Sequence, residues 1–588
     1  MPYCIGAQKG IKPVEVPESI WYNDASEIII MLPSYLFGEF QMKMNPVRNS
    51  KVNNPANLPE QSSSEASHQF PTEQEAIFSP DRDTAYNGMN PAPQSGQRGG
   101  VNRREFLKTA GASLSAVMAL DFVMAGDGVS RPNILFFYPD QHRFDWTSMN
   151  PELPDITPNL KQLAKRGVHF TNAFCPSPLC APSRACLASG KTYANCGVAG
   201  NGNPYPLHQT TFYSLLRDAG YQVLGCGKFD LDKPGKSWGA DGKHQREGKP
   251  SLPEVWGFSD GIDNAGKQDG VNAYKKLNKP EPYFAFLRSR NLVDAHLKNF
   301  KTLDHDYPGP SIMPDDAYCD NWIANNGLNL IQSVPRGKPW FIQVNFNGPH
   351  PPMDITKSMY ENWKDTTFPP AKAGKSDDLT AKRRNYGAMI HNIDRWLGIF
   401  QDELKKRGEL ENTLIAYCSD HGEMLGDRGM SGKSKPYHPS ACVPLVMAGP
   451  AIRNNVVYDK PIETLDLTAT FLDYAGISIP EDMDSRSLRP FLEGRSAPPR
   501  TYTTSSLSSW SLVFDGRYKL IANLTNGKKS KKTKPTKELA LYDLKTDPAE
   551  IHDISAQHPD IVERLKPLLP PLSPYTNLKK EAKKDSPR

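Results

Sequence analysis

Residues 180–184 read Cys-Ala-Pro-Ser-Arg and place a thiol beside a fixed cation at the start of a helical pattern. Pro182 restricts the backbone, and Ser183 and Arg184 begin the helical segment. The first amide N–H groups of such a helix, together with the guanidinium of Arg184, would face an anion. The alternative is a buried structural cysteine beside a helix start, which is the commoner role of a lone cysteine.

Other polar candidates follow four short apolar runs that have the length of buried strands. The runs and the residues after them are Ile134–Tyr138 before Asp140 and Gln141, Tyr221–Cys226 before Lys228, Phe341–Phe346 before His350, and Thr413–Cys418 before Asp420 and His421. In open α/β sheets, ligands bind beyond the carboxyl ends of the strands. We therefore expect the four ends to converge on one crevice.

The segment 180–184, with Leu187 and Gly190 after it, resembles the maturation signature of type I sulfatases, a family of the alkaline phosphatase superfamily. In that family the cysteine is oxidised to formylglycine, and the hydrated aldehyde is a geminal diol. One hydroxyl attacks the sulfur of a sulfate ester, and the second allows sulfate to leave as the aldehyde re-forms. The resemblance, which extends from Arg131 to about Ser555, implies that Cys180 is the precursor of the nucleophile.

The resemblance also implies a metal site. Asp140 and Gln141 match the first acidic pair of the family, with glutamine in second place, and Asp420 and His421 match the second pair beside the modified Cys180. Two carboxylates, an amide oxygen and an imidazole suit a divalent cation that polarises the sulfate oxygens and the attacking diol. The oxygen ligands favour one calcium ion per chain, whereas the histidine leaves manganese open.

Four further residues match positions that handle sulfate in the family. Sulfate needs fixed cations in a poorly solvated pocket. Arg184 matches the residue that holds the formylglycine hydrate, Lys228 matches the lysine of the Gly-Lys motif, and Lys433 matches the sulfate-binding lysine. His350 matches the histidine that contacts the bridging oxygen and helps to protonate the leaving alcohol.

Position 230 departs from the family pattern. The family commonly has Gly-Lys-x-His, whereas this chain has Asp230 two residues after Lys228. The missing histidine is the usual base for expelling sulfate. Asp230 either replaces that base, if burial raises its pKa, or hydrogen-bonds the hydrate while another group acts as base.

From Arg131 onward, apolar runs alternate with helical patterns, which predicts a mostly parallel α/β sheet covered on both faces. By resemblance, the fold is alkaline-phosphatase-like, with a catalytic domain over residues 131–480 and an α+β subdomain with a basic tail over residues 481–588. Three helices are expected, one begun by Thr157 and Pro158 and ended by Gly167, one at about 211–220 and one at about 386–407. In the C-terminal part, residues 512–521 and 539–544 flank a Lys-rich connection, as in a hairpin.

The first 125 residues differ from the rest. Residues 51–100 are rich in Pro, Asn, Ser and Gln, so we interpret residues 1–100 as a disordered or wrongly assigned leader. Residues 102–108 resemble a twin-arginine export signal, and residues 101–125 are predicted to be its signal peptide, with the true start near Met89 or Val101 and the mature protein from about Gly126. An amphipathic helix with a chance Arg pair is the alternative. The export signal implies a periplasmic or secreted bacterial protein.

Composition agrees with a large enzyme, because 588 residues with 38% hydrophobic content support a sizeable core. The net charge of +5 only mildly favours acidic substrates. Nine cysteines have no regular spacing, so a disulfide is possible but unassigned. The apolar run within 109–120 is too short for a membrane span, and we expect neither an integral membrane segment nor a nucleic-acid partner.

The resemblance implies a sulfatase acting on an organic sulfate ester, favoured to be a sulfated carbohydrate. Its partners would be that substrate, a formylglycine-generating maturase and the twin-arginine export machinery. A phosphonate or phosphate ester hydrolase of the same superfamily and a non-catalytic binder of sulfated glycans are the alternatives. Loops over residues 201–209 and 264–308 are expected to determine specificity, because they carry aromatic and basic residues suited to sugars.

Overall fold

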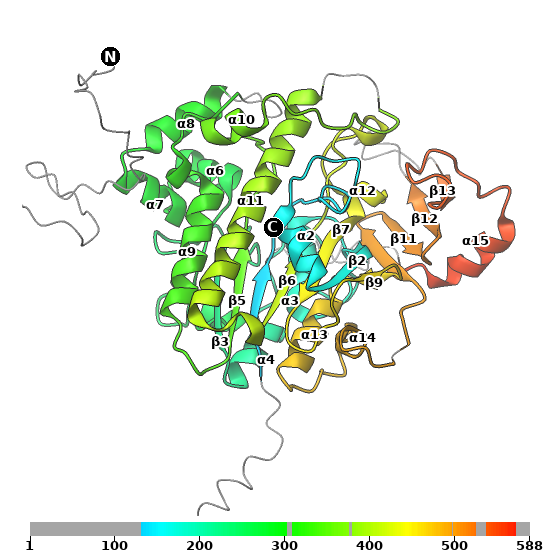
Figure 1. Cartoon of the computed structure of the whole chain (residues 1–588), viewed down its shortest axis with the longest axis horizontal. Helices are drawn as coiled ribbons and strands as arrows, with labels where there is room; N and C mark the ends of the chain where they lie inside the picture. The colour runs from blue at the N-terminus through cyan, green and yellow to red at the C-terminus, as the bar shows by residue number, and fades with distance from the viewer. Residues whose placement is uncertain (1–130, 303–308, 375–378, 497, 525–536, 572–588) are drawn as a thin grey trace, which may run out of the picture. The chain divides into compact units, whose positions relative to one another are not determined.

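A large mixed sheet forms the centre of the computed structural model, which describes residues 131–302, 309–374, 379–496, 498–524 and 537–571. Within these residues the sheet has nine strands in the order β4-β3-β5-β1-β6-β7-β2-β8, with β9 paired to β2 (Figure 1). Every pairing is parallel except those that β7 makes with β2 and β6. The expected mostly parallel sheet is confirmed, with β7 as its antiparallel exception.

The strands of the large sheet include the four expected runs, each within one residue of the predicted bounds. They are β1 (Asn133–Phe137), β2 (Gly167–Phe174), β3 (Gln222–Gly227), β4 (Asp260–Asp263), β5 (Trp340–Asn345), β6 (Thr413–Cys418), β7 (Cys442–Ala448), β8 (Val456–Tyr458) and β9 (Ile462–Glu463). A second sheet, antiparallel, contains β10 (Thr503–Leu507), β11 (Trp510–Phe514), β12 (Tyr518–Leu524) and β13 (Lys537–Asp543).

Helices connect these strands. They are α2 (Pro158–Lys165), α3 (Cys180–Ser189), α4 (Phe212–Asp218), α5 (Leu252–Trp256), α6 (Lys267–Leu277), α7 (Pro282–Ser289), α8 (Val293–Thr302), α9 (Cys319–Ser333), α10 (Lys357–Trp363), α11 (Thr380–Arg407), α12 (His438–Ala441), α13 (Asp466–Tyr474), α14 (Arg489–Leu492) and α15 (Pro559–Leu565), with short 3-10 turns η1 (Asp315–Ala317), η2 (Leu410–Asn412), η3 (Asp427–Gly429) and η4 (Lys566–Leu568). In the described part of the chain, no helix combines the length and apolar character needed to cross a membrane. The predicted leader, export signal, Lys-rich connection and basic tail lie outside the described residues.

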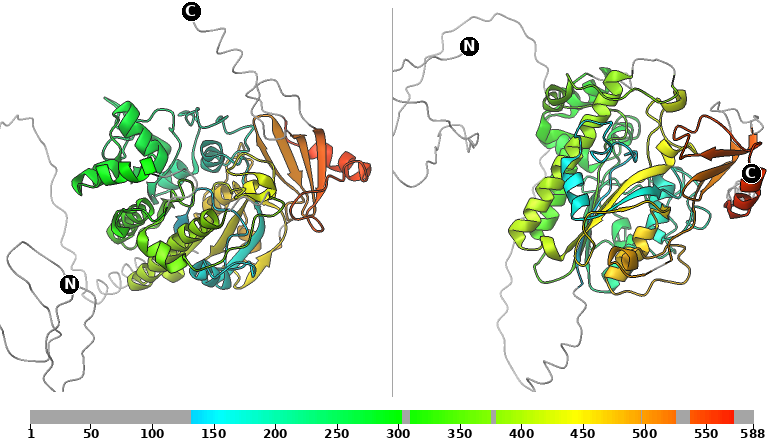
Figure 2. Two further views of the ribbon diagram at one scale, coloured as in Figure 1. Left: turned by 90° about the horizontal axis from the view of Figure 1, so that it is seen from above. Right: turned by 45° about the vertical axis from the view of Figure 1, so that its right-hand side comes forward.

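Both faces of the large sheet are covered by helices, as expected. Successive residues of β1 point to opposite faces, so Ile134 and Phe136 pack in one apolar cluster with α3, α4 and α13. Leu135 and Phe137 pack in the other cluster with α2, α9 and α11. Figures 1 and 2 show α9 and α11 side by side on one side of the sheet. β1 is therefore the apolar centre of both layers.

The start of α2 corrects one sequence prediction. Thr157 occupies the N-cap position but makes no side-chain cap, because its Oγ1 accepts a hydrogen bond from the Ser148 amide at 2.7 Å. The free amides of α2 are instead capped by Asp394 of α11, which accepts from Asn159 N at 3.0 Å and from Leu160 N at 2.7 Å. Asp394, which is distant in sequence, thus caps α2 in place of the local residue Thr157.

Gly167 does not end this helix, contrary to the prediction. α2 stops at Lys165, and Gly167 is the first residue of β2. A Cβ at position 167 would lie 2.1 Å from the carbonyl oxygen of Met447 on β7. The glycine therefore allows two strands to approach closely rather than terminating a helix.

Two further predictions need correction. Residues 512–521 are not one strand, because Gly516 (φ 98°) and the Asp515 carboxylate, which accepts from Arg517 N and Tyr518 N, form a tight turn between β11 and β12. Residues 264–308 are not a loop either, since α6, α7 and α8 fill most of that range. The helix at about 211–220 is confirmed as α4, and α11 begins at Thr380, one to two turns before its predicted start.

Asp394→Ala should lower the free energy of unfolding by about 1–2 kcal/mol, because the buried amides at the start of α2 lose their acceptor. Asp394→Asn, which keeps one acceptor oxygen, should lose less. Asp402→Ala is the control, since Asp402 lies on α11 with an exposed carboxylate. Urea unfolding followed by circular dichroism measures the three changes. Equal midpoints for Asp394→Ala and Asp402→Ala would show that Asp394 does not cap α2.

Candidate active site

The candidate residues come together at one edge of the large sheet. β3, β5, β1 and β6 are adjacent and parallel, so their carboxyl ends meet at the same edge. The ends of these strands carry Lys228, His350, Asp140 and Asp420 respectively. Helix α3 starts at Cys180 beside them, and all ten of its residues are buried. A cysteine, carboxylates, lysines and a histidine therefore share one buried place.

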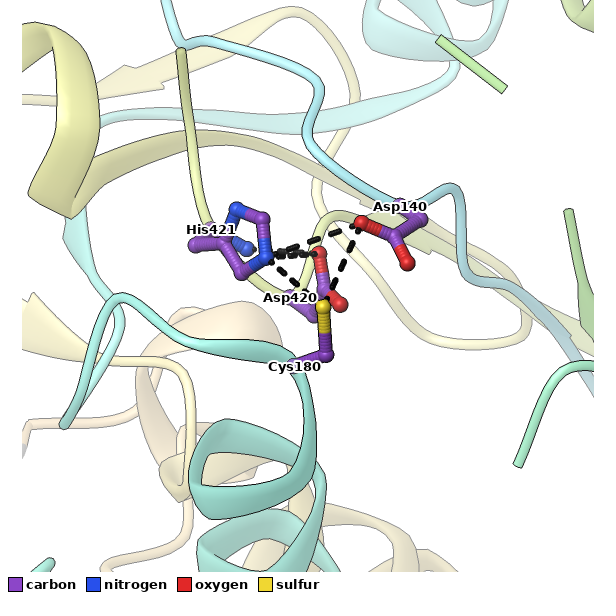
Figure 3. Close-up of side chains that lie close together, drawn as sticks. All are labelled: Asp140, Cys180, Asp420 and His421. Atoms are coloured by element: carbon purple, nitrogen blue, oxygen red, sulfur yellow. Dashed lines mark hydrogen bonds and ion pairs between the residues drawn. The ribbon is translucent and has the colours of Figure 1, made fainter. Parts of the chain in front are cut away.

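Four of these side chains form a compact group, shown in Figure 3. One ligand atom from each of Asp140, Cys180, Asp420 and His421 lies within 4.8 Å of the others, and all four residues are buried. His421 Nε2 is 3.4 Å from Cys180 Sγ, 3.6 Å from Asp140 Oδ1 and 3.7 Å from Asp420 Oδ1. The two carboxylate distances exceed those of a good hydrogen bond. These oxygen and nitrogen donors thus face a common point, which fits a divalent cation.

Gln141 stands beside this group with its amide engaged elsewhere. Its Nε2 donates to Glu423, its Oε1 accepts from Lys433 Nζ at 2.8 Å, and its backbone N donates to Asp420 Oδ1 at 3.0 Å. Glu423 is fully buried and also accepts from Gly432 N. Glu423 was not among the residues predicted from the sequence, although it lies in the same Asp-His-Gly-Glu segment as Asp420. Glu423 and Lys433 hold the orientation of the Gln141 amide.

Two lysines approach Cys180 from different parts of the chain, Lys228 from the end of β3 and Lys433 from the loop before α12. Lys228 Nζ pairs with Asp140 and lies 3.7 Å from Cys180 Sγ. Lys433 Nζ lies 3.2 Å from the same sulfur. Burial and Asp140 raise the pKa of the Cys180 thiol, but Lys228, Lys433 and His421 outweigh them and hold this pKa well below its ordinary value. The surroundings of position 180 therefore stabilise negative charge.

Arg184 lies behind the carboxylates rather than in the open pocket. Its guanidinium is 3.0 Å from Asp420 Oδ2 and 3.8 Å from Asp140 Oδ2, and it stacks over Tyr138 with 4.9 Å to the ring centroid. The side chain is almost fully buried. Because Arg184 lies one turn after Cys180 on α3, its ion pairs position the start of the helix against both carboxylates.

Asp230 forms two ion pairs and does not line the pocket next to Cys180. Its Oδ2 lies 3.3 Å from Lys228 Nζ and 3.1 Å from Lys233 Nζ. The backbone is held locally, since the Asp263 carboxylate accepts from Phe229 N at 2.9 Å and pairs with His244 at 2.8 Å. These contacts place the Asp230 carboxylate between the ammonium groups of Lys228 and Lys233.

A pocket of about 290 Å³ opens onto Cys180. Its lining is polar and comes from the strand ends, from Asn201 and from the first turns of α6: Cys180, Asn201, Lys228, Lys233, Ala265, Gly266, Lys267, Gln268, Asp269, Asn272, Asn347, His350, Pro351 and Lys433. Both segments predicted to determine specificity contribute to it, although the second does so mainly through a helix. Lys233, which no sequence signal distinguished from a surface lysine, was missed.

His350 reaches this pocket with one ring nitrogen already engaged. Its Nδ1 lies 2.6 Å from the carbonyl oxygen of Pro351, so Nδ1 carries the hydrogen, and the imidazole also hydrogen-bonds the Cys180 side chain. Burial and the Lys433 cation lower the pKa of His350, while Asp140 opposes them.

The cysteines in the described part of the chain are all free thiols. Eight are described, and each is buried. No disulfide forms among these eight residues. Cys186 and Cys196 belong to the apolar cluster on one face of the large sheet, as expected for small hydrophobic side chains.

Comparisons with known proteins agree with this arrangement. The model of the sulfatase family matches residues 132–477, and that of the C-terminal region of N-sulphoglucosamine sulphohydrolase matches residues 426–572. The chain is 27% identical over 412 residues to an arylsulfatase of Clostridium perfringens, covering 63% of this chain and 80% of the relative. It is 26% identical over 475 residues to an N-acetylglucosamine-6-O-sulfatase of Bacteroides thetaiotaomicron, covering 72% and 82%. Phosphonate monoester hydrolase of Agrobacterium radiobacter has a similar fold, with a TM-score of 0.60, 23% identity and coverage of 74% and 94%.

Glu281 supports the pocket wall from behind. Its carboxylate accepts from Ala265 N at 3.2 Å and from Phe284 N at 2.8 Å, and burial raises its pKa from 4.5 to about 7. A raised folded-state pKa means that the native protein binds this proton more tightly than the unfolded chain does. The stabilising effect of the protonated group is therefore complete below pH 4.5 and is lost as the pH rises to about 7.

Glu281→Gln removes this titration. The free energy of unfolding of the wild type, relative to that of the variant, should fall by on the order of 2–3 kcal/mol between about pH 4.5 and 8. Urea unfolding of both proteins at a series of pH values measures the difference. Parallel pH profiles would show that burial does not disfavour the charged form of Glu281.

Proposed function

The chain belongs to the sulfatase family and is a sulfuric ester hydrolase, and we propose that it cleaves carbohydrate sulfates with a formylglycine formed from Cys180 and a bound divalent metal. The observation that carries this mechanism is the convergence of Lys228, Lys433 and His350 on Cys180 within one polar pocket. A sulfate group at this place would exchange its hydration shell for fixed cations. Lys228 and Lys433 would bind its non-bridging oxygens.

Two absent groups complete the proposed chemistry. A formylglycine at position 180 supplies a geminal diol, which combines a nucleophilic hydroxyl with a second hydroxyl that lets the aldehyde re-form. A divalent metal, proposed to be calcium, would be held by Asp140, Asp420 and His421, with Gln141 and the modified residue 180 completing the set, and would polarise the sulfate oxygens. The buried donors around a common point support this proposal.

His350 is proposed to protonate the leaving alcohol. Its Nδ1–H is held by the Pro351 carbonyl, which directs Nε2 toward the substrate. The negative charge of a bound sulfate would offset the effect of Lys433 and favour a proton on Nε2. That proton could then pass to the bridging oxygen as the S–O bond breaks. Asp230, paired with two lysines, is proposed to position Lys228 rather than to act as the base.

The carbohydrate part of the proposal rests on the pocket lining. Amides, lysines and a carboxylate line it, and no Phe, Tyr or Trp belongs to the described lining. A hydroxyl-rich alcohol suits such walls better than an aromatic alcohol, which would need apolar contacts. The similarity to an N-acetylglucosamine-6-O-sulfatase supports the same substrate class.

Phosphonate ester hydrolysis is the second candidate. The fold similarity to a phosphonate monoester hydrolase favours it, because the same cations would bind a phosphonate. Parallel assays with 4-nitrophenyl sulfate and 4-nitrophenyl phenylphosphonate discriminate between the two. A higher kcat/KM for the sulfate supports the sulfatase proposal, and a higher value for the phosphonate overturns it.

We also propose that the chain is exported through the twin-arginine pathway after a maturase has converted Cys180. The motif at residues 102–108 supports export, and that segment lies outside the described residues. Twin-arginine export carries folded proteins, so folding and the conversion of Cys180 could both be complete before the chain is secreted.

The tryptic peptide 167–184 from protein made in the native host should carry an aldehyde at position 180. It contains Cys175 as an internal control, which should remain a thiol because it lies outside the Cys-Ala-Pro-Ser-Arg motif that begins at Cys180. Mass spectrometry with fragmentation locates the change. Cys180→Ala should abolish sulfate ester hydrolysis, whereas Cys186→Ala on the same helix should retain it. An active protein with an unconverted thiol at position 180 would overturn the formylglycine mechanism.

Lys433→Ala should lower kcat/KM for 4-nitrophenyl sulfate by about 10²–10³, the usual loss when one fixed donor to a developing charge is removed. Lys435→Ala is the matched control, since Lys435 lies two residues away and does not line the pocket. Initial rates of nitrophenol release measure both. A loss below tenfold would show that Lys433 does not bind the sulfate group.

A further inference from the structure

An ion pair at the mouth of the pocket is not explained by the cleavage chemistry. Lys233 Nζ lies 3.0 Å from Asp269 Oδ2 and 3.1 Å from Asp230 Oδ2. Lys233 and Asp269 both line the pocket that contains Cys180. Their side chains are 15% and 27% exposed, whereas that of Lys228 is only 5% exposed. The pair therefore belongs to the accessible wall and not to the buried floor.

Each partner keeps hydrogen-bonding capacity for a ligand. An ammonium has three N–H donors, and the two carboxylates occupy two of those of Lys233. Asp269 uses Oδ2 for the pair, and its Oδ1 has no donor among the described residues. Although burial opposes it, Lys233 with other lysines lowers the pKa of Asp269, so this side chain is an acceptor at neutral pH. The wall thus presents one free donor beside one free acceptor.

Hydroxyl groups match this arrangement, since a hydroxyl both accepts and donates a hydrogen bond. The neighbouring wall residues Asn201, Gln268 and Asn272 are amides and offer further donors and acceptors. An ion pair adds no net charge to the wall, so it gives no attraction for a second anionic group on the substrate. A neutral polyol bearing one sulfate fits best.

We propose that Lys233 and Asp269 bind two neighbouring hydroxyl groups of the leaving alcohol and so select a monosulfated sugar over an aryl sulfate. Lys233 donates to one hydroxyl oxygen, and Asp269 accepts from the other hydroxyl. This inference rests on the proposed sulfatase function and names the part of the substrate that the pair recognises.

Lys233 and Asp269 could each stabilise the fold without binding substrate, so the test needs a control ion pair outside the pocket. Asp269 lies in the first turn of α6, where a negative charge is favoured by the helix dipole. Lys243 and Asp260 form a second ion pair in the same region, with side chains 30% and 60% exposed, and neither lines the pocket. Lys243→Met and Asp260→Asn therefore make the same chemical changes away from the substrate.

The experiment compares Lys233→Met and Asp269→Asn with these two controls in protein whose Cys180 conversion has been verified. Rates are measured with 4-nitrophenyl sulfate and with a panel of monosulfated hexoses and N-acetylhexosamines. For the best sugar sulfate, we expect each pocket variant to lose kcat/KM at least tenfold more than it does for the aryl sulfate, mainly through KM. The controls should match the wild type with both substrates.

Different failures have different meanings. Equal losses with both substrates would assign the pair a structural role and overturn this inference while leaving the sulfatase proposal intact. A wild type that cleaves the aryl sulfate but none of the sugar sulfates would also overturn it. A converted wild type that cleaves no sulfate ester would instead refute the proposed function itself.

Discussion

The site depends on the burial of two carboxylates, which follow the ends of the adjacent strands β1 and β6 at one edge of the sheet. Asp140 and Asp420 are fully buried, and each buried ion costs several kcal/mol unless it is paired. Arg184 contacts both, and Lys228 pairs with Asp140. Because Arg184 lies on α3, the same ion pairs that neutralise the carboxylates also orient the helix that begins at Cys180. The ion pairs of Arg184 therefore both neutralise the carboxylates and place Cys180, the precursor of the nucleophile.

Helix α3 is held as firmly at its other end. Gly190 ends it in a left-handed conformation (φ 66°), and its carbonyl accepts from Asp484 N and Ser485 N. A Cβ at this position would lie 2.8 Å from Met483 Sδ, so the glycine of the motif serves packing as well as the turn. Ion pairs fix one end of the helix and close packing fixes the other. The helix therefore holds Cys180 next to Asp140, Asp420 and His421.

Asp230 links the floor of the pocket to its wall. Its carboxylate pairs with Lys228, which contacts the cysteine, and with Lys233, which contacts Asp269 on α6. A histidine in this place could not neutralise two ammonium groups. The aspartate at position 230 therefore changes the electrostatics of the wall, because its carboxylate balances both Lys228 and Lys233.

The sequence alone determined the mostly parallel sheet and the four strand ends, because the apolar character of a strand and the polar residues that follow it are local properties. The grouping of Asp140, Cys180, Asp420 and His421 followed from the resemblance of their motifs to those of sulfatases. Tertiary structure decided what depends on contacts between distant segments. Asp394 on α11 caps the start of α2. Position 167 needs a glycine because the carbonyl oxygen of Met447 leaves no space for a Cβ. Part of the pocket lining comes from α6, whose Asp269 pairs with Lys233. Such contacts have no signature in either segment by itself, since the interaction energy belongs to the pair and exists only after the chain has folded.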